Sequence, residues 1–102
     1  MYFGVSVRLF KIKLATDNIN IVFICLIILL IAALYYNRAV VFHRMGATDE
    51  SLKDVSVALE LAPIDPHLYV FRGNLLVSLQ RYKEAMTDFH SALILDDNIP
   101  LS

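Results

Sequence analysis

The chain has 102 residues, of which 58% are hydrophobic, with a mean hydropathy of +0.60 and a formal net charge of −1. This length allows one domain of about four helices with a modest core, and it excludes a large enzyme. The charge balance predicts no nucleic-acid partner. The lone Cys25 lies among apolar residues and has no second cysteine with which to form an internal disulfide.

Most of the apolar excess lies before residue 43. Residues 1–17 form a basic segment that contains Arg8, Lys11 and Lys13, and residues 18–34 are predicted to form an apolar helix. From Ile21 to Tyr36 no face is polar, so the helix has no amphipathic stripe and must be surrounded on all sides. The residues taken to represent this surface are Ile21, Phe23, Leu26, Leu29, Leu30 and Ile31.

The apolar helix is predicted to be a single membrane span. Its Ile, Leu, Val and Phe residues favour insertion by about −5 kcal/mol in total, at roughly −0.5 kcal/mol each. Residues 18–34 would be about 25 Å long against roughly 30 Å of hydrocarbon, a mismatch that a bilayer tolerates at modest cost. Tyr35 and Tyr36 suit the headgroup boundary.

Other interpretations of this helix stay open. It resembles a signal peptide, although cleavage after Ala32 or Ala33 would remove the start of the next element. It could also be buried against partner subunits in a larger assembly, with a cytoplasmic location. The basic flank favours a cytosolic N-terminus only weakly, so the sequence leaves the orientation open.

A repeat of 34 residues follows. Residues 34–65 and 68–99 align without a gap, and because neither Gly nor Pro occurs between Gly4 and Gly46, the first repeat helix should continue directly from the apolar helix. The residue pairs that match across the two copies include Tyr35 with Tyr69, Arg38 with Arg72, Glu50 with Glu84, Asp54 with Asp88, Ala58 with Ala92, Leu59 with Leu93 and Leu61 with Leu95.

Helical spacing and breaks predict a helix–turn–helix unit in each copy. In the first, a helix should end near Met45, and a second helix should start with Thr48 or Asp49 near its N-cap and end before Pro63. In the second, helices are predicted from Pro66 to about Leu79 and from Tyr82 to Leu95. Small residues are expected where paired helices approach closely, namely Ala39, Gly73, Ala58, Ala85 and Ala92, and large residues fill the remaining space, namely Phe42, Leu76, Tyr82 and Phe89.

This pattern of length, aromatic, small and closing Pro residues resembles the tetratricopeptide repeat. The matching positions are Tyr35, Ala39, Phe42, Ala58 and Pro63 in the first copy and Tyr69, Gly73, Leu76, Tyr82, Ala85, Phe89 and Ala92 in the second. The departures are Thr48, Ser51 and Val55 in the first copy and Asp97 in the second. The resemblance implies an all-α fold in which repeats at 32–65 and 66–99 form a fragment of an α-solenoid, followed by a tail at 100–102. An unrelated helical bundle with accidental self-similarity is the alternative.

The resemblance further implies that the first helices of the repeats line a concave groove that holds a peptide or a partner's helix. The groove residues would be Tyr36, Asn37, Val40, His43, Arg44, His67, Val70, Phe71, Asn74, Val77 and Ser78. One subclass of the family grips a chaperone's C-terminal carboxylate with basic side chains, but here the matching basic positions hold Tyr36, Val70, His67 and Phe71. A carboxylate would be desolvated there without a cation, so we expect a largely apolar or helical ligand.

No catalytic or cofactor motif is visible. The chain has three histidines and one cysteine without metal-ligand spacing, no Gly-rich phosphate loop and no nucleophile–base arrangement. We therefore expect a non-catalytic, membrane-tethered interaction module that needs no metal or cofactor. The alternative is a structural subunit, or a shortened form of a longer repeat array. Because two repeats are fewer than a stable stack usually needs, the uncapped second repeat is expected to pair with another protein or to self-associate.

Overall fold

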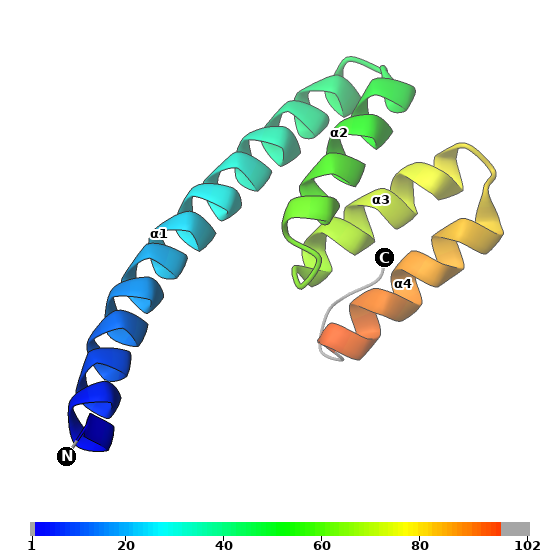
Figure 1. The fold of residues 1–102 in the computed structure, drawn as a ribbon. Helices are drawn as coiled ribbons and strands as arrows, with labels where there is room; N and C mark the ends of the chain where they lie inside the picture. The colour runs from blue at the N-terminus through cyan, green and yellow to red at the C-terminus, as the bar shows by residue number, and fades with distance from the viewer. Residues whose placement is uncertain (1, 97–102) are drawn as a thin grey trace.

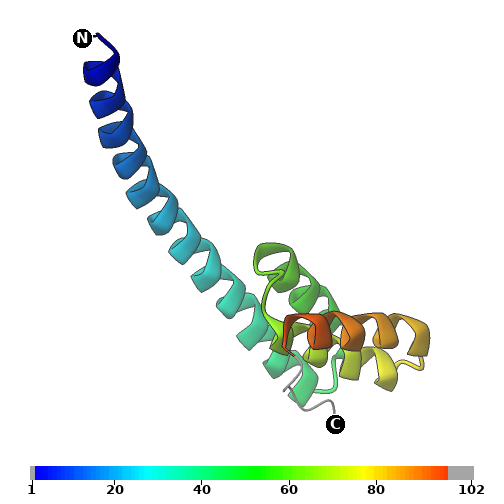
Figure 2. The same cartoon turned by 90° about the horizontal axis from the view of Figure 1, so that it is seen from below.

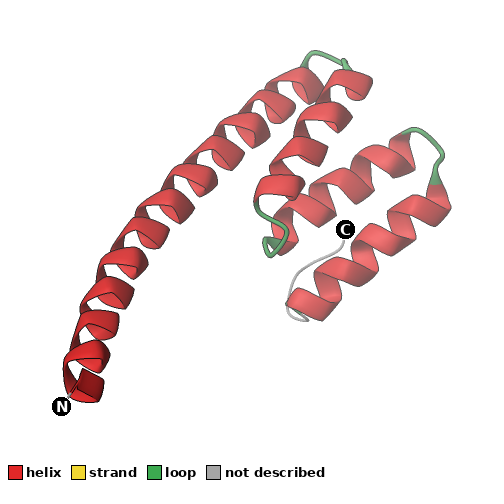
Figure 3. Cartoon of the chain, viewed as in Figure 1, coloured by secondary structure: helices red, strands yellow, loops and turns green. Residues whose placement is uncertain are grey.

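The computed structural model describes the backbone of residues 2–96 and the side chains of residues 18–96. Within that range the fold is all-α, as the sequence predicted, with no strand (Figure 3). The helices are α1 (Tyr2–Arg44), α2 (Thr48–Leu61), α3 (Pro66–Ser78) and α4 (Tyr82–Leu95). The expected tail at 100–102 and Asp97 lie outside the described residues.

Helix α1 is a single helix of 43 residues, which confirms that the apolar segment continues into the first hairpin. Its N-terminal half projects away from the other three helices in both views (Figures 1 and 2), and the chain measures 66 × 26 × 19 Å along its principal axes. The hairpin begins to cover α1 at Ala32, whose side chain is 3% exposed. The C-terminal part of α1 packs against α2, α2 packs against α3, and α3 packs against α4.

Both hairpins turn through the same backbone hydrogen bonds. After α1, the N–H of Ala47 donates to the carbonyl of Phe42 at 2.8 Å, and after α3 the N–H of Arg81 donates to that of Leu76 at 2.8 Å. This bond is typical of a helix that ends on a left-handed residue, a position held by Gly46 (φ +81°) in one turn and Gln80 (φ +61°) in the other. The second turn therefore repeats the first without its glycine.

Thr48 and Asp49 lie just after the N-cap of α2, close to the predicted position. The N-cap is Ala47, which has no capping side chain, and Thr48 is the first helical residue. The turn's own backbone bonds fix where α2 starts, so the polar side chains of Thr48 and Asp49 lie just inside the helix. Helix α3 has a conventional start, since the Asp65 side chain accepts a hydrogen bond from the N–H of His67 at 3.0 Å and Pro66 follows the cap.

The small residues lie where the helices approach closely, as predicted. Ala39, Ala58 and Ala92 are fully buried. In the first hairpin the Ser51 hydroxyl of α2 donates a hydrogen bond to the backbone carbonyl of Ala39 in α1 at 2.6 Å. In the second hairpin Gly73 is required, because a Cβ there would lie 2.5 Å from the nearest ring atom of Phe89. The first hairpin has the smaller Val55 at the position of Phe89, and so it accommodates Ala39.

We predict that Gly73 and Phe89 are energetically coupled. In the native chain, Gly73→Ala must displace the Phe89 ring, whereas in a Phe89→Val background the space is open and alanine's higher helix propensity contributes up to about 1 kcal/mol. Gly73→Ala should therefore be more favourable in that background by about 1–2 kcal/mol in the free energy of unfolding. Denaturant unfolding of the four chains of this double-mutant cycle in detergent, followed by circular dichroism, measures the coupling, and additive effects would contradict it.

Candidate functional site

The predicted groove residues lie on the C-terminal part of α1 and along α3. Four of them are half-buried, namely Tyr36, Val40, Val70 and Phe71. The other seven are exposed, namely Asn37, His43, Arg44, His67, Asn74, Val77 and Ser78. The half-buried members therefore form the floor of this face, and the exposed members, which are polar apart from Val77, lie around it.

Phe71 is the residue that joins the two helices on this face. Its ring packs edge to face with Tyr36 at 5.3 Å between centroids and with His43 at 5.8 Å. Tyr36 and His43 are separated by two turns of α1, so one aromatic ring of α3 spans both. The resulting cluster of Tyr36, His43 and Phe71, here called the aromatic cluster, holds α1 and α3 side by side.

The remaining predicted residues are not brought into one compact site. His67 lies in the first turn of α3, while Ser78 is its last residue and donates to the Asn74 carbonyl of its own helix at 3.2 Å. A separate cleft of about 470 Å³ lies where α1 meets the α2–α3 loop, and it includes Tyr36 of the predicted groove and Leu29 of the predicted span. Its lining residues are Leu29, Ala32, Ala33, Tyr36, Ala62, Ile64, Asp65, Pro66 and Leu68.

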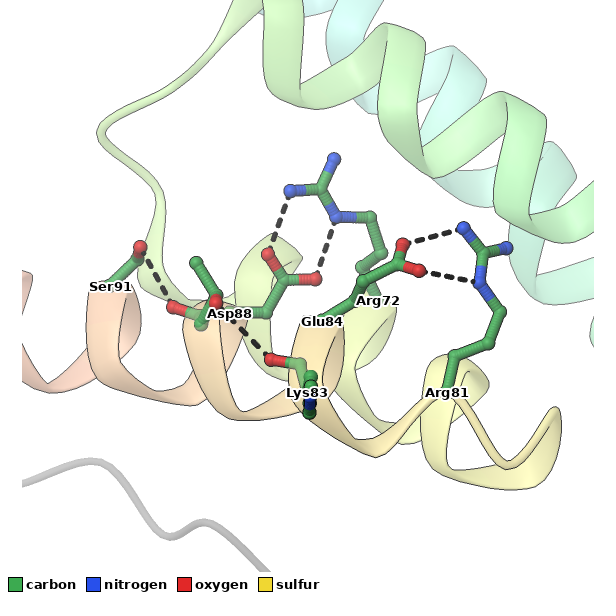
Figure 4. A network of polar contacts seen from close by, with 7 residues as sticks. Arg72, Arg81, Lys83, Glu84, Asp88 and Ser91 are labelled. Atoms are coloured by element: carbon green, nitrogen blue, oxygen red, sulfur yellow. Dashed lines mark hydrogen bonds and ion pairs between the residues drawn. The ribbon is translucent and has the colours of Figure 1, made fainter.

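Two ion pairs that the sequence did not predict link the helices of the hairpins. Arg38 donates to both carboxylate oxygens of Asp54 at 2.6 and 2.9 Å, and Arg72 donates to both oxygens of Asp88 at 2.7 Å. Both pairs join the two helices of a hairpin, and Figure 4 shows the second beside the Arg81–Glu84 pair. The signal was present, because arginine and aspartate match at these positions in both copies.

These two pairs differ in exposure. The carboxylates are buried, with side chains 8% exposed at Asp54 and 4% at Asp88, but Arg38 is 60% exposed against 27% for Arg72. Hydrogen bonding to Arg38 holds the pKa of Asp54 below its usual value, and hydrogen bonding to Asp88 raises the pKa of Arg72. Each guanidinium also lies near an aromatic ring, with Arg38 5.5 Å from the Tyr35 centroid and Arg72 5.9 Å from that of Tyr69.

The apolar part of α1 is mostly exposed within the isolated chain, and among residues 18–31 Ile28 is half-buried. Ile21, Phe23, Leu26, Leu29 and Leu30 are 48–63% exposed and Ile31 is 39% exposed. Among the described residues, one stretch is long and apolar enough to cross a membrane, Asn18–Arg44, with a hydropathy of 2.7 over its most apolar window, 6% of which is buried. Length and composition alone support this statement.

Residues 18–96 contain no cluster of His, Cys, Asp and Glu that would hold a metal ion. Asp54 and Asp88, the two buried carboxylates in this range, are both committed to arginines. Their geometry suits a structural role, since the carboxylates are occupied by bidentate hydrogen bonds.

Comparison with known proteins finds relatives whose alignments with this chain extend over up to 69 residues, about the length of the two repeat copies. The chain is 33% identical over 67 residues to Hsp70-Hsp90 organizing protein of Triticum aestivum, covering 66% of this chain and 12% of that protein. It is 32% identical over 69 residues to sperm-associated antigen 1A of Danio rerio (68% and 16%) and 38% identical over 48 residues to tetratricopeptide repeat protein 16 of Mus musculus (47% and 6%). The matched part thus spans less than a fifth of each relative, and no family model matches the chain.

We predict that Asp54 contributes to acid sensitivity. Because its folded-state pKa is lowered, its stabilising effect is present above the unfolded pKa of about 4 and is lost as the pH falls through the folded value. Asp54→Asn should therefore lower stability at neutral pH and reduce the further loss between about pH 6 and about pH 3. Thermal unfolding of the full chain in detergent measures both effects. Glu60→Gln, on the exposed side of α2, is the matched control, and an equal effect of that change on the pH dependence would contradict the prediction.

Proposed function

Residues 32–99 belong to the tetratricopeptide repeat family, and from this premise we propose that the chain is a membrane-tethered, non-catalytic module for binding another protein. The tether is the apolar part of α1. The binding face is the inner side of α1 and α3. The aromatic cluster carries the proposal of a binding face, because it places the half-buried rings of Tyr36 and Phe71 on a face where His43 and other polar groups are exposed.

The chemistry of this face favours an apolar or amphipathic helical segment of a partner. Val40 and Val70 are half-buried beside the aromatic cluster, and Val77 is 41% exposed on the last turn of α3. Burying such side chains contributes about 25 cal/mol per Å² of apolar area. Asn37 and Asn74 supply exposed amides that fix the orientation of a ligand's backbone.

A chaperone's terminal carboxylate fits this face poorly. The name of the wheat relative associates that protein with Hsp70 and Hsp90, but the face has valine, aromatic and histidine side chains at the basic positions expected for such a ligand. Arg44, the last residue of α1, is the sole arginine or lysine among the predicted groove residues. A desolvated carboxylate without a charged partner costs a few kcal/mol, and so an apolar ligand is favoured.

The tether is supported by the exposure of α1. A helix that is apolar on every face needs an apolar environment on every side, and within residues 18–96 Ala32 is the first buried residue of α1. A bilayer supplies that environment. The half-buried Tyr35 and Tyr36 follow at the expected headgroup boundary, where the hairpin begins.

The alternative is a structural subunit whose apolar helix is buried by partner proteins in a larger, cytoplasmic assembly. It rests on the same exposed surface, because a protein core covers Ile, Leu and Phe as well as lipid does. The membrane tether and the structural subunit differ in the treatment that releases the chain from a membrane fraction. A lipid-embedded span resists alkaline treatment, whereas a helix held by protein contacts is released with its complex.

We predict that the full chain stays in the membrane pellet after alkaline carbonate extraction. Leu26→Lys with Leu30→Lys should release it, because each charge adds about 3 kcal/mol near the middle of the span and together they exceed the −5 kcal/mol that favours insertion. The matched control places the same charges on the hairpins, as Glu60→Lys with Asn74→Lys, and should be retained. Release of the native chain as a large soluble complex would favour the subunit, and an N-terminus that begins after Ala32 or Ala33 would reveal a cleaved signal peptide.

We predict that peptides selected from a random displayed library on the full chain in detergent carry apolar residues at helical spacing. Phe71→Ala and Val77→Ser should each weaken a selected peptide at least about threefold, whereas Asn74→Ala should have a smaller effect. Val77 makes the second test independent of folding, because its side chain is exposed. Equal losses for Phe71→Ala and Asn74→Ala, with no dependence on the apolar residues of the peptide, would contradict an apolar groove.

A further inference from the structure

The repeat allows α2 and α4 to be compared position by position. On α2 the side that faces α3 is covered: Leu59 is 5% exposed, Val55 is fully buried and Leu52 is half-buried. The matching residues of α4 are more open. This row of residues, here called the α4 stripe, consists of Tyr82 (58% exposed), Met86 (68%), the half-buried Phe89 and Leu93 (39%).

The same comparison between α3 and α1 gives a second open surface. On α3, Leu68 and Leu75 are 4% and 1% exposed, and Leu79 just after its end is half-buried. The matching residues, here called the α1 stripe, are Leu34 (60% exposed) and Val41 (53%) on α1 and Met45 (72%) just after its end. The greater exposure of Arg38 than of Arg72 has the same cause, since none of the helices that the structure describes covers this side of α1.

Within one chain, α2 and α3 cover each other's apolar residues. The α4 stripe matches the surface of α2 in this contact and the α1 stripe matches that of α3, but both stripes are uncovered, one at each end of the repeat pair. We propose that the α4 stripe of one copy binds the α1 stripe of a second copy, head to tail. In this contact α4 of one copy would pack against α1 of the next in the way that α2 packs against α3 within one chain. The proposal rests on the repeat assignment made above and does not depend on the groove ligand. Leu34 of the α1 stripe is also the last residue of the proposed membrane span, so the contact would form at the edge of the bilayer.

A second copy is favoured as the occupant because one chain carries both complementary surfaces. Each stripe has apolar residues at helical spacing (i, i+4, i+7 and i+11 on α4; i, i+7 and i+11 on α1), so each presents one side of a helix. The α1 stripe lies on the side of α1 opposite Tyr36 and His43, so the proposed contact leaves the aromatic cluster in place. The match between α1 and α3 has one departure, because α1 has Asn37 at the position that corresponds to Phe71 of α3.

Such a contact is heterologous, because different surfaces of the two copies meet. It leaves one α4 stripe and one α1 stripe open in a dimer, so larger assemblies can grow from it. This property separates it from a symmetric α4–α4 dimer and from association through the apolar part of α1. Two variants that each block one stripe test it directly.

The test compares Met86→Lys, which blocks the α4 stripe, with Val41→Lys, which blocks the α1 stripe. Sedimentation velocity of the full chain in density-matched detergent should show concentration-dependent dimers and larger species for the native chain and at least about tenfold weaker association for each variant alone. A mixture of the two variants in equal amounts should form dimers but nothing larger, because one intact α4 stripe then meets one intact α1 stripe. Ile94→Lys is the matched control and should associate like the native chain, since Ile94 is 71% exposed on α4 but matches the exposed Glu60 of α2.

Three results would overturn the proposal: a native chain that stays monomeric, a Val41→Lys chain that associates like the native one, or a mixture of variants that stays monomeric while circular dichroism shows both to be folded. Association that resists both variants would instead locate it in the apolar part of α1. None of these results bears on carbonate extraction or on peptide binding. Failure of the head-to-tail contact is therefore distinguishable from failure of the proposed function.

Discussion

The close approach of paired helices at small residues is the constraint on which the rest of the structure depends. Ala39 and Gly73 let the second helix of each hairpin come near enough for Ser51 to bond the backbone of α1 and for Phe89 to cover Gly73. The same approach brings Arg38 and Arg72, each one residue before the small residue, within bidentate reach of Asp54 and Asp88. Those two carboxylates are nearly buried, so a wider crossing would leave them without donors at a cost of several kcal/mol.

Continuity of α1 links this packing to the proposed function. Because one helix carries both the apolar segment and the first half of a hairpin, the inner face of the repeats has a fixed direction relative to the proposed span. A flexible linker would lose that relation. Along this part of α1, Ala32 and Ala39 are buried in the core, while Leu34 and Val41 stay exposed on another side of the helix.

The two hairpins are alike in sequence pattern but not in environment. Arg38 and Arg72 make the same ion pair, yet Arg38 is more than twice as exposed because it lies at an open end of the stack. Leu59 and Leu93 differ for the same reason. A short solenoid has a large share of its residues at its ends, so end effects dominate its surface chemistry.

The sequence alone determined the helices, their order and the repeat. The predicted range of roughly Tyr82 to Leu95 agrees with α4, because period, spacing and breaks are local properties that recur 34 residues apart. At the start of α2 the local pattern located the region of the N-cap, but the N-cap itself is Ala47 and no side chain caps the helix. The tertiary structure alone decided that Phe71 would bridge Tyr36 and His43, that the matched arginines and aspartates would form ion pairs, and which repeated apolar positions would stay open. These facts depend on which helix lies beside which, and burial and side-chain partners exist only once the helices have packed.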